Sequence, residues 1–348
     1  MSRALLEQLI SGKDLTQEQA ADLLRLLASG EVEPAAAGAL LTALRIKGEA
    51  AAEIRGFALA MRELATHPAL PPGEAYVDIV GTGGDGSGSL NLSTGSALLA
   101  AAAGLKVVKH GNRSISSRSG SADALAAIGL PVPLDAEAAA RCLEQTGFTF
   151  LFAPHYHPAM KHIMPVRQAL GVRTVFNVLG PLVNPAEPPF HVLGAASEPL
   201  AALMADTIAE MPIERAFVVY GAAGWDEATP IGPFVCFDVS AGKVERQIRD
   251  PKDFGIARCS ESDLAGGEPN ENADRLVAAL RGHDSDAHRD ALVIGAALAL
   301  EVTGDEPDFE SGIKRAREAI RSGAAAALLD RIASFSTAEK TAGQSEAG

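Results

Sequence analysis

Acidic residues are missing from one stretch of this chain. The 348 residues include 44 Asp and Glu, yet none lies among the 37 residues from Gly86 to Ala122, where a proportional share would be about four to five. The stretch contains several hydroxyl side chains and the cations Lys106, Lys109, Arg113 and Arg118. Because no acid is close to these cations in the sequence, we expect them to be free for an anionic ligand. Together with a glycine-rich turn and a helix start, they indicate a pyrophosphate site.

Cysteine is also scarce, and no segment has the composition of a signal-peptide core. The three cysteines, Cys142, Cys236 and Cys259, form no CxxC pair, which argues against both a disulfide framework and a zinc knuckle. The apolar run from Gly95 to Leu105 is too short to cross a bilayer. We therefore expect reduced cysteines, no membrane partner and a cytoplasmic location.

The chain as a whole lacks an excess of positive charge. Its formal net charge is −14 and its sequence pI is about 5.0. Nucleic-acid binding needs an extended basic face, so we expect no nucleic-acid partner and infer that the anion is small. The hydrophobic content of 47% can supply a substantial core, and the length favours about two domains.

The first part of the chain has the apolar periodicity of helices, whereas the rest alternates between strand-like and helix-like segments. From 2 to 66, apolar residues recur every three or four positions, which predicts about four helices. The prolines between His67 and Gly73 indicate a linker, and the β-like and helical segments that follow are typical of an α/β fold with a mostly parallel sheet. The predicted divisions are a small N-terminal all-helical domain (1–68, joined by part of the Pro-rich stretch 154–189), a larger α/β domain (74–153 and 190–335) and a flexible tail (336–348).

Short apolar segments in the α/β part predict seven strands, the last two forming a hairpin around Ser240-Ala-Gly242. The predicted strands are 75–80, 106–109, 149–153, 191–195, 216–220, 234–239 and 244–248. Helices are predicted over 271–281, 284–302 and 308–332.

A glycine-rich turn, Gly81-Thr-Gly-Gly-Asp-Gly86, follows the first of these strands. Glycines allow a backbone to approach a phosphate closely. The turn matches neither the Walker pattern nor GxGxxG with a later acid, so an ordinary tight turn remains an equal alternative at this point. Ser93 and Thr94 open the next predicted helix, where hydroxyls either cap the helix or contact a phosphate or magnesium ion.

Two further clusters follow predicted strands. Lys109-His-Gly-Asn-Arg-Ser-Ile-Ser-Ser117 gathers an amine, a guanidinium, an imidazole, an amide and three hydroxyls, which favours an anion site over a solvated basic loop. Asp226 and Glu227 lie where an α/β sheet places ligands. Solvated loop acids are the common alternative, but beside a pyrophosphate site a magnesium role is preferred.

The stretch 154–189 is dense in basic side chains. His155, His157 and His162 lack the neighbouring acid or cysteine of a recognised zinc set, so we expect them to line a pocket. Arg167 is either a surface charge or a bidentate clamp on a carboxylate.

The ordered set GTGGDG, NxST, KHGNRSxSSxSGSAD, HPAMKH, PVRxxLGxRTxFNxLGPLxNP and a strand-turn Asp-Glu resembles the anthranilate phosphoribosyltransferase family over nearly the whole chain. Each motif alone is weak, whereas the set is specific. The resemblance implies a homodimeric, magnesium-dependent enzyme of tryptophan biosynthesis with the nucleoside-phosphorylase-like phosphoribosyltransferase fold. Three departures stand in the chain: Ser89 for the usual Thr, Trp225 for an aliphatic residue, and Gly295 for Asn.

Carried over by motif, the resemblance implies three sets of site residues. The set expected to bind phosphoribosyl pyrophosphate is Gly81, Gly84, Asp85, Ser89, Asn91, Leu92, Ser93, Thr94, Lys109, His110, Gly111, Asn112, Arg113, Ser114, Ile115, Ser116, Ser117 and Ser121. The set expected to bind anthranilate is Gly81, Asn112 and Arg167. The set expected to bind Mg²⁺ is Ser93, Asp226 and Glu227.

The implied reaction joins the amine of anthranilate to the anomeric carbon of the ribose and releases pyrophosphate. An aryl amine is neutral at pH 7, so we expect no residue to act as a general acid or base. Two alternatives remain open. A pyrimidine nucleoside phosphorylase would use inorganic phosphate, and a non-catalytic nucleic-acid-binding relative would show a basic face and need no acid pair.

Overall fold

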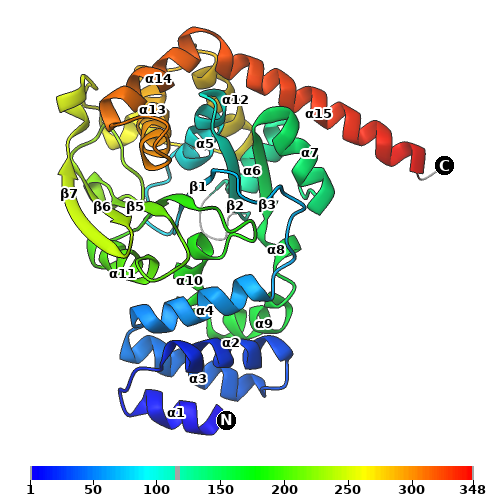
Figure 1. The fold of residues 1–348 in the computed structure, drawn as a ribbon, viewed down its shortest axis with the longest axis vertical. Helices are drawn as coiled ribbons and strands as arrows, with labels where there is room; N and C mark the ends of the chain where they lie inside the picture. The colour runs from blue at the N-terminus through cyan, green and yellow to red at the C-terminus, as the bar shows by residue number, and fades with distance from the viewer. Residues whose placement is uncertain (1, 114–117, 347–348) are drawn as a thin grey trace.

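Strands and helices alternate after residue 75 and build one seven-stranded sheet (Figure 1). The structure is a computed structural model that describes residues 2–113 and 118–346. The strand order is β3-β2-β1-β4-β5-β6-β7; β1 to β5 are parallel, and β6 and β7 run antiparallel. The strands are β1 (Tyr76–Gly81), β2 (Lys106–Gly111), β3 (Phe148–Phe152), β4 (Phe190–Gly194), β5 (Arg215–Tyr220), β6 (Phe234–Ser240) and β7 (Lys243–Arg249). All seven predicted strands are confirmed.

Alternation along the strands divides the sheet's apolar side chains between two cores. In β5, Phe217 and Val219 join the core under the upper helices, whereas Ala216 and Val218 join the core that continues into the N-terminal helices. Sheets covered on both faces need apolar residues at nearly every position, which explains the unbroken hydrophobic runs in the sequence. The helices of the α/β part are α5 (Leu92–Ala102), α6 (Ser121–Ile128), α7 (Ala136–Thr146), α11 (Glu198–Ile208), α12 (Pro269–Leu280), α13 (Asp286–Val302), α14 (Phe309–Arg321) and α15 (Ala324–Glu346), with short 3-10 turns η2 (Ala222–Gly224), η3 (Pro251–Phe254) and η4 (Glu261–Leu264).

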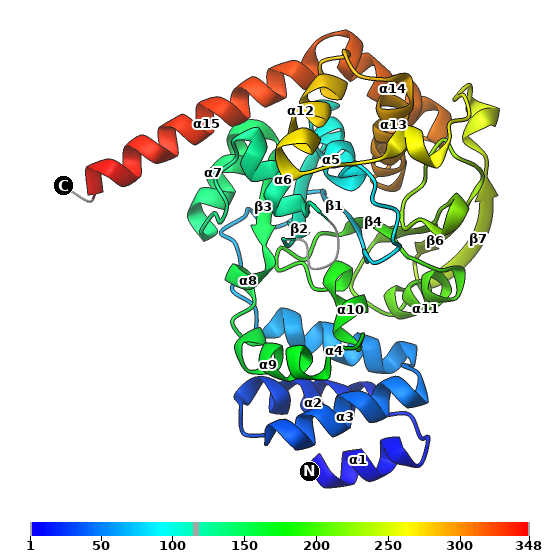
Figure 2. The same cartoon turned by 180° about the vertical axis from the view of Figure 1, so that it is seen from behind.

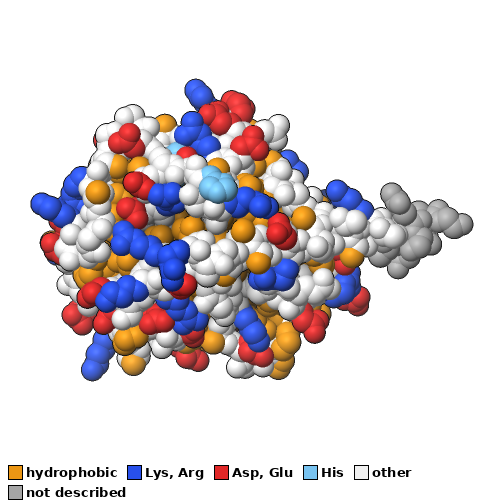
Figure 3. Space-filling model, turned by 90° about the horizontal axis from the view of Figure 1, so that it is seen from above, with side chains coloured by type: hydrophobic (Ala, Val, Ile, Leu, Met, Phe, Trp, Pro, Cys, Tyr) orange, Lys and Arg blue, Asp and Glu red, His pale blue; other side chains and the backbone are white. Residues whose placement is uncertain are grey.

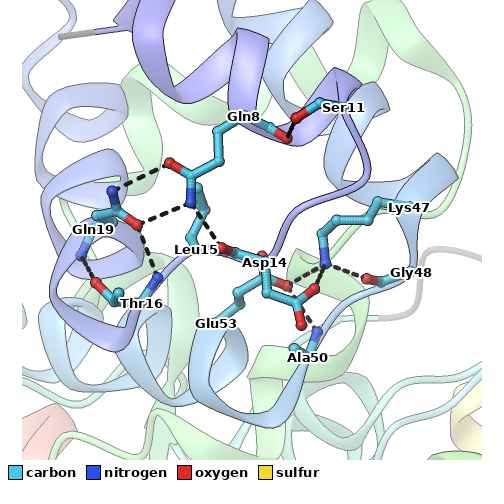
Figure 4. A network of polar contacts seen from close by, with 10 residues as sticks. All are labelled: Gln8, Ser11, Asp14, Leu15, Thr16, Gln19, Lys47, Gly48, Ala50 and Glu53. Carbon is cyan, nitrogen blue, oxygen red and sulfur yellow. Dashed lines mark hydrogen bonds and ion pairs between the residues drawn. The ribbon is translucent and has the colours of Figure 1, made fainter.

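The N-terminal helices form a separate layer below the sheet (Figure 1). They are α1 (Ser2–Ile10), α2 (Gln17–Ser29), α3 (Pro34–Lys47) and α4 (Ala51–Glu63). Glu53, fully buried, ties them together, because its carboxylate accepts hydrogen bonds from Leu15 N (2.8 Å), Ala50 N (2.7 Å) and Lys47 Nζ (2.9 Å) (Figure 4). These donors satisfy the buried carboxylate, so this group of contacts fixes the loop before α2 and the loop after α3.

Part of the segment from 154 to 189 lies between the two layers. It contains α8 (Ala153–Tyr156), α9 (Met160–Leu170), α10 (Phe176–Leu179) and η1 (Gly180–Leu182). α9 packs against α2 and α3, and α10 packs against α4 (Figure 2). This packing supports the predicted domain division, which stays a prediction.

The C-terminal region differs from the prediction. One helical segment was expected over 308–332, but α14 and α15 are separate helices because Gly323 takes a left-handed φ of 82° between them. α15 continues as a helix to Glu346 and projects from the body of the protein (Figures 1 and 2), and the flexible tail expected from Ser336 stays a prediction. Several alanines and the absence of proline allow the helix to continue, and Arg141 contacts it through an ion pair with Glu339 (2.9 Å). Within the described residues, no helix has the length and apolar content to cross a membrane.

Candidate active site

The candidate site lies at the carboxyl ends of β1, β2, β4 and β5, where parallel sheets place ligands. The glycine turn leaves β1 after Gly81, and Lys109 and His110 end the buried part of β2. The acid pair follows β5 and η2. Because β4 lies between β1 and β5 in the sheet, the residues that follow these strands lie at the same side of the sheet, at the carboxyl ends of the strands, although they are far apart in the sequence.

The glycine turn is bound directly to Asp226. Gly83 donates its backbone N–H to Asp226 Oδ2 (2.6 Å), and Asp226 donates its own N–H to Asp85 Oδ2 (3.4 Å). A Cβ on Gly81 would overlap the Asp226 carboxylate, and one on Gly194 would overlap the Asp226 carbonyl oxygen. Glycine is therefore required at both strand ends for this close approach.

Glu227 joins the acid pair to the start of α5. Its Oε1 accepts the backbone N–H of Ser93 (2.9 Å), while Asn91, which precedes the helix, makes no side-chain cap. Glu227 thus supplies the oxygen that a capping residue would normally provide. Its Oε2 is buried and has no hydrogen-bond partner among the described residues.

The surroundings of the acid pair disfavour two negative charges. Burial raises the pKa of Asp226 to about 7, and the charge of Asp85 adds to the effect. Burial also raises the pKa of Glu227 well above its usual range, with Asp226 as the second cause. Two buried carboxylates become stable as anions when a cation is bound between them.

These residues fit a magnesium ion. Magnesium takes hard oxygen ligands and commonly combines one or two carboxylates with substrate phosphates and water. Glu227 Oε2 is such an oxygen without a partner. Across residues 2–113 and 118–346, no three His, Cys, Asp or Glu side chains gather into a metal-ligand set, so the pair would need other oxygens, such as a hydroxyl, substrate phosphates or water, to complete the coordination of the ion.

The four cations of the acid-free stretch are not all free, which corrects the prediction. Lys106 forms an ion pair with Glu74 (2.7 Å), and Arg113 forms one with Asp123 (2.9 Å). Asp123 directly follows the stretch without acids, whereas Glu74 lies 12 residues before it, and the absence of acids inside the stretch did not show that either would form an ion pair.

Lys109 is buried in β2, in agreement with the predicted strand 106–109. Its Nζ donates to the carbonyl of Ile79 and to Ser93 Oγ (3.3 Å). Burial lowers the pKa of Lys109, against the opposing charges of Asp78, Glu227 and Asp226. The amine therefore lies between β1 and the start of α5.

The remaining residues predicted for phosphoribosyl pyrophosphate surround these elements. Asn91 donates to the carbonyl of Ser119 (3.0 Å) and accepts from Asn272 (2.9 Å). Ser121 Oγ donates to the carbonyl of Asn112 (3.2 Å). The other placements are as follows: Gly84 and Asp85 in the glycine turn, Ser89 beside Ser87, Leu92 and Thr94 buried in α5, His110 and Gly111 at the end of β2. Ser114, Ile115, Ser116 and Ser117 lie outside the described residues.

Arg167 stands apart from the other two residues predicted for anthranilate. It extends from α9 with its guanidinium 5.3 Å from the centre of the Phe176 ring, and Nη1 donates to Met164 Sδ (3.6 Å). Burial lowers its pKa. Its hydrogen bond goes to Met164 instead of to Gly81 or Asn112, so the structure does not bring this set together by direct contact.

Sequence reasoning missed a buried polar cluster behind β1 and β2. Asp78 accepts from Asn184 Nδ2 (2.9 Å) and from the backbone N–H of His110 (3.3 Å), and His157 Nε2 contacts His110 Nε2 at 3.2 Å. Burial raises the pKa of Asp78 to about 6. A charged residue inside an apolar strand was the available signal.

Comparison with known proteins identifies the family. Residues 73–326 match the glycosyl transferase family a/b domain, and residues 3–65 match the helical bundle domain of the same family. Anthranilate phosphoribosyltransferase of Shewanella sp. (strain ANA-3) is 46% identical over 96% of both chains, and that of Chloroflexus aggregans is 45% identical over 97% of this chain and 99% of the relative. The chain belongs to the anthranilate phosphoribosyltransferase family.

Solved anthranilate phosphoribosyltransferases have the same fold. The enzyme of Thermus thermophilus superposes with a TM-score of 0.89 at 42% identity, covering 96% of this chain and 99% of its own. The enzyme of Saccharomyces cerevisiae, solved in complex with PRPP and Mg, superposes with a TM-score of 0.87 at 29% identity, covering 97% and 98%. The predicted fold class and family resemblance are confirmed.

Proposed function

We infer that this chain is a magnesium-dependent anthranilate phosphoribosyltransferase. It transfers the 5-phosphoribosyl group of phosphoribosyl pyrophosphate to the amine of anthranilate and releases pyrophosphate, the second step of tryptophan biosynthesis from chorismate. The observation that carries this function is the acid pair: Asp226 holds the glycine turn, and Glu227 holds the N-terminus of α5. The two phosphate-binding elements and the expected metal ligands therefore form one unit.

The diphosphate is proposed to lie over the glycine turn and the start of α5. Gly83, Gly84 and Gly86 take left-handed φ values (67°, 76° and 74°), and the absence of Cβ atoms at these positions lets a phosphate approach the backbone closely. Magnesium bound by Ser93, Asp226 and Glu227 would neutralise charge that develops on the departing diphosphate. The proposed site is completed by other residues in the roles expected from the sequence: Asn91, Thr94, Lys109, Asn112, Arg113 and Ser121.

Anthranilate is proposed to bind near Arg167, with Gly81 and Asn112 as the other contacts. The guanidinium of Arg167 has no carboxylate within ion-pair distance among the described residues and is partly buried, so an arriving carboxylate would gain a charge-assisted hydrogen bond. The guanidinium lies over the Phe176 ring, 5.3 Å from its centre, and this cation–π contact helps to hold it in place. The approach of the amine then depends on movement of α9 toward the sheet.

The mechanism requires positioning more than proton transfer. The neutral aryl amine already carries a lone pair, so no dedicated base is needed. Backbone amides of the glycine turn and the Lys109 amine stabilise the leaving group, and Arg167 holds the nucleophile on the opposite side of the sugar. Attack from that side inverts the anomeric carbon.

A homodimer is proposed through the N-terminal helices. An apolar groove of about 1000 Å³ lies among α1, α3 and α9. Ile10 and Ile46 are 66% and 81% exposed there. Large exposed apolar patches mark protein interfaces. The proposed partner is a second copy of the chain, which would pack against this groove through its own α1, α3 and α9.

No nucleic-acid partner and a cytoplasmic location remain parts of this proposal. On the face seen from above, basic and acidic side chains are interspersed instead of forming one basic surface (Figure 3). Several basic side chains are paired with acids, as in Arg317–Asp290 (3.0 Å) and Arg281–Asp330 (2.9 Å), which reduces the positive charge available to a nucleic acid.

The deciding experiment mixes the protein with phosphoribosyl pyrophosphate, MgCl₂ and anthranilate and follows the loss of anthranilate fluorescence. Turnover is expected only when all three are present, and a chelator should stop it. Phosphorolysis of pyrimidine nucleosides in a parallel assay, without use of anthranilate, would favour the nucleoside phosphorylase alternative. Salt-dependent DNA binding without turnover would favour the nucleic-acid-binding one.

A further inference from the structure

Arg173 connects the segment that carries Arg167 to the glycine turn. It follows α9 and its C-terminal Gly171, and its Nη1 donates to the carbonyl oxygen of Gly84 (3.3 Å). The guanidinium lies so close to the turn that a Cβ on Gly84 would be 2.6 Å from Nη1. Two parts of the chain that are 89 residues apart thus meet at the expected diphosphate position.

The partner of Arg173 in this structure is a weak one. A guanidinium has five N–H donors, and a neutral carbonyl uses one of them. Among the described residues, no carboxylate lies within ion-pair distance of Arg173, and its side chain is exposed. By contrast, Arg113, another predicted binding residue, is paired with Asp123. Arg173 is therefore a cation that is available at the site.

The carbonyl that Arg173 contacts lies one residue from the part of the turn that is bound to the expected metal ligand. Gly83 donates its N–H to Asp226 Oδ2 (2.6 Å), and the next residue, Gly84, offers its carbonyl to Arg173. A diphosphate that shared a magnesium ion with Asp226 would lie within reach of a guanidinium that already touches the turn. Phosphate oxygens match the forked guanidinium better than one carbonyl does.

We propose that Arg173 is a substrate-binding residue for the diphosphate of phosphoribosyl pyrophosphate, delivered to the glycine turn by the segment that also carries Arg167. This inference rests on the proposed function. On binding, the guanidinium exchanges the Gly84 carbonyl for phosphate oxygens. Because Arg167 lies six residues earlier on the same segment, occupation of the turn also places the anthranilate clamp.

Three variants test this role against a structural one. Arg173→Ala removes the cation, Arg173→Gln keeps hydrogen-bonding capacity without charge, and Arg173→Lys keeps the charge. Arg321→Ala is the control, because it removes a guanidinium that is 79% exposed on α14. All four variants should have the same melting temperature as the wild type.

Steady-state kinetics should separate the two substrates. Arg173→Ala and Arg173→Gln are expected to raise the KM for phosphoribosyl pyrophosphate on the order of tenfold. Arg173→Lys should recover part of that loss, and the KM for anthranilate should change less. Unchanged KM values in Arg173→Ala, an increase confined to anthranilate, or equal effects of Lys and Gln would each overturn the proposal.

A direct binding measurement keeps the test independent of the reaction. Calorimetric titration with pyrophosphate and MgCl₂ should give weaker binding by about tenfold to Arg173→Ala than to wild type or Arg321→Ala. Equal binding to all three proteins, or none to wild type, overturns the role of Arg173. If wild type binds pyrophosphate but makes no product from anthranilate, the proposed function fails while the role of Arg173 stands or falls on the titration.

Discussion

Gly83 and Asp226 are 143 residues apart in the chain, yet the Gly83 N–H lies 2.6 Å from Asp226 Oδ2. The aspartate therefore both shapes the glycine turn and faces the expected magnesium position. Charge and hydrogen bonding can be tested separately. Asp226→Asn keeps an acceptor for Gly83 and removes the charge, whereas Asp226→Ala removes both.

Both Asp226 variants should lose turnover by about 100-fold or more, because magnesium ligation needs the anion. Asp226→Ala should also lower the melting temperature, since the Gly83 amide loses its acceptor. Turnover measured across a range of MgCl₂ concentrations checks this, with Glu261→Ala, an exposed acid, as the control. Wild-type activity of Asp226→Asn at every magnesium concentration would contradict the assignment of Asp226 as a metal ligand.

Arg167→Ala should weaken anthranilate binding with little effect on phosphoribosyl pyrophosphate. Loss of a charge-assisted hydrogen bond costs about 1.5–3 kcal/mol, which corresponds to a KM for anthranilate raised by roughly tenfold to 100-fold. Arg167→Lys should recover little, because an ammonium group lacks the fork. Gln168→Ala on the same helix is the control. An unchanged KM for anthranilate in Arg167→Ala would remove Arg167 from the site.

Gly194→Ala should destabilise the protein and abolish turnover together. Its added Cβ would overlap the carbonyl oxygen of Asp226, so either β4 or the acid pair must shift. Overpacking of this kind costs about 1–3 kcal/mol in free energy of unfolding. Chemical denaturation measures the loss, and Gly180→Ala, whose Cβ would meet no atom within 4 Å, serves as the stability control. Equal stability of the two variants would contradict this prediction, because it would show that the end of β4 can accommodate a Cβ at residue 194.

His191 should make the protein sensitive to acid. It is fully buried in β4 with no partner for either ring nitrogen among the described residues. Burial, followed by the charge of Arg62, lowers its pKa to about 3. The unfolded chain binds a proton below pH about 6.5 and the folded chain does not, so the stability from this group is complete above pH about 6.5 and is lost as the pH falls toward about 3.

His191→Leu removes this dependence. Relative to the variant, the wild type should lose about 1.4 kcal/mol of unfolding free energy per pH unit, or about 2 kcal/mol between pH 6.5 and 5. Urea denaturation at the two pH values measures the change, and His283→Gln, at an exposed histidine, should show no such difference. A constant gap between wild type and His191→Leu would argue that His191 is protonated inside the fold.

Ile46→Glu should separate the proposed dimer. The side chain is 81% exposed at the apolar groove, and a charge there would have to be buried between two copies. Light scattering should give about twice the 35.9 kDa chain mass for wild type and the single chain mass for the variant. Ile248→Glu, 64% exposed on β7 outside the groove, should remain dimeric. A monomeric wild type would overturn the dimer proposal itself.

The sequence predicted those features that depend on local patterns. Apolar runs bounded by glycine and proline located every strand, and the turn at Gly81–Gly86 and the acid pair at Asp226 fell at strand ends as expected. Local patterns could not show that Gly194 makes room for Asp226, because that requirement arises only when β4 is placed beside β1.

Predictions based on nearby sequence failed where the partner came from elsewhere. Lys106 was expected to be free because no acid lies within the stretch that contains it. In the structure it begins β2 beside the start of β1, and Glu74, just before β1, forms an ion pair with it. The length of α15 was also missed, because its small and polar last residues show no apolar periodicity, although no proline interrupts them and Arg141 contacts Glu339 from another helix.

Because Ser93 is hydrogen-bonded to Glu227, the active site can form only after residue 227 has been synthesised. A nascent chain that ends before residue 226 already contains the glycine turn, the first turn of α5 and the Lys109 loop, yet it lacks the oxygens that join them. Truncated products would therefore possess the recognisable motifs of this enzyme without a working centre. Split halves of the protein should regain activity only after they reassociate.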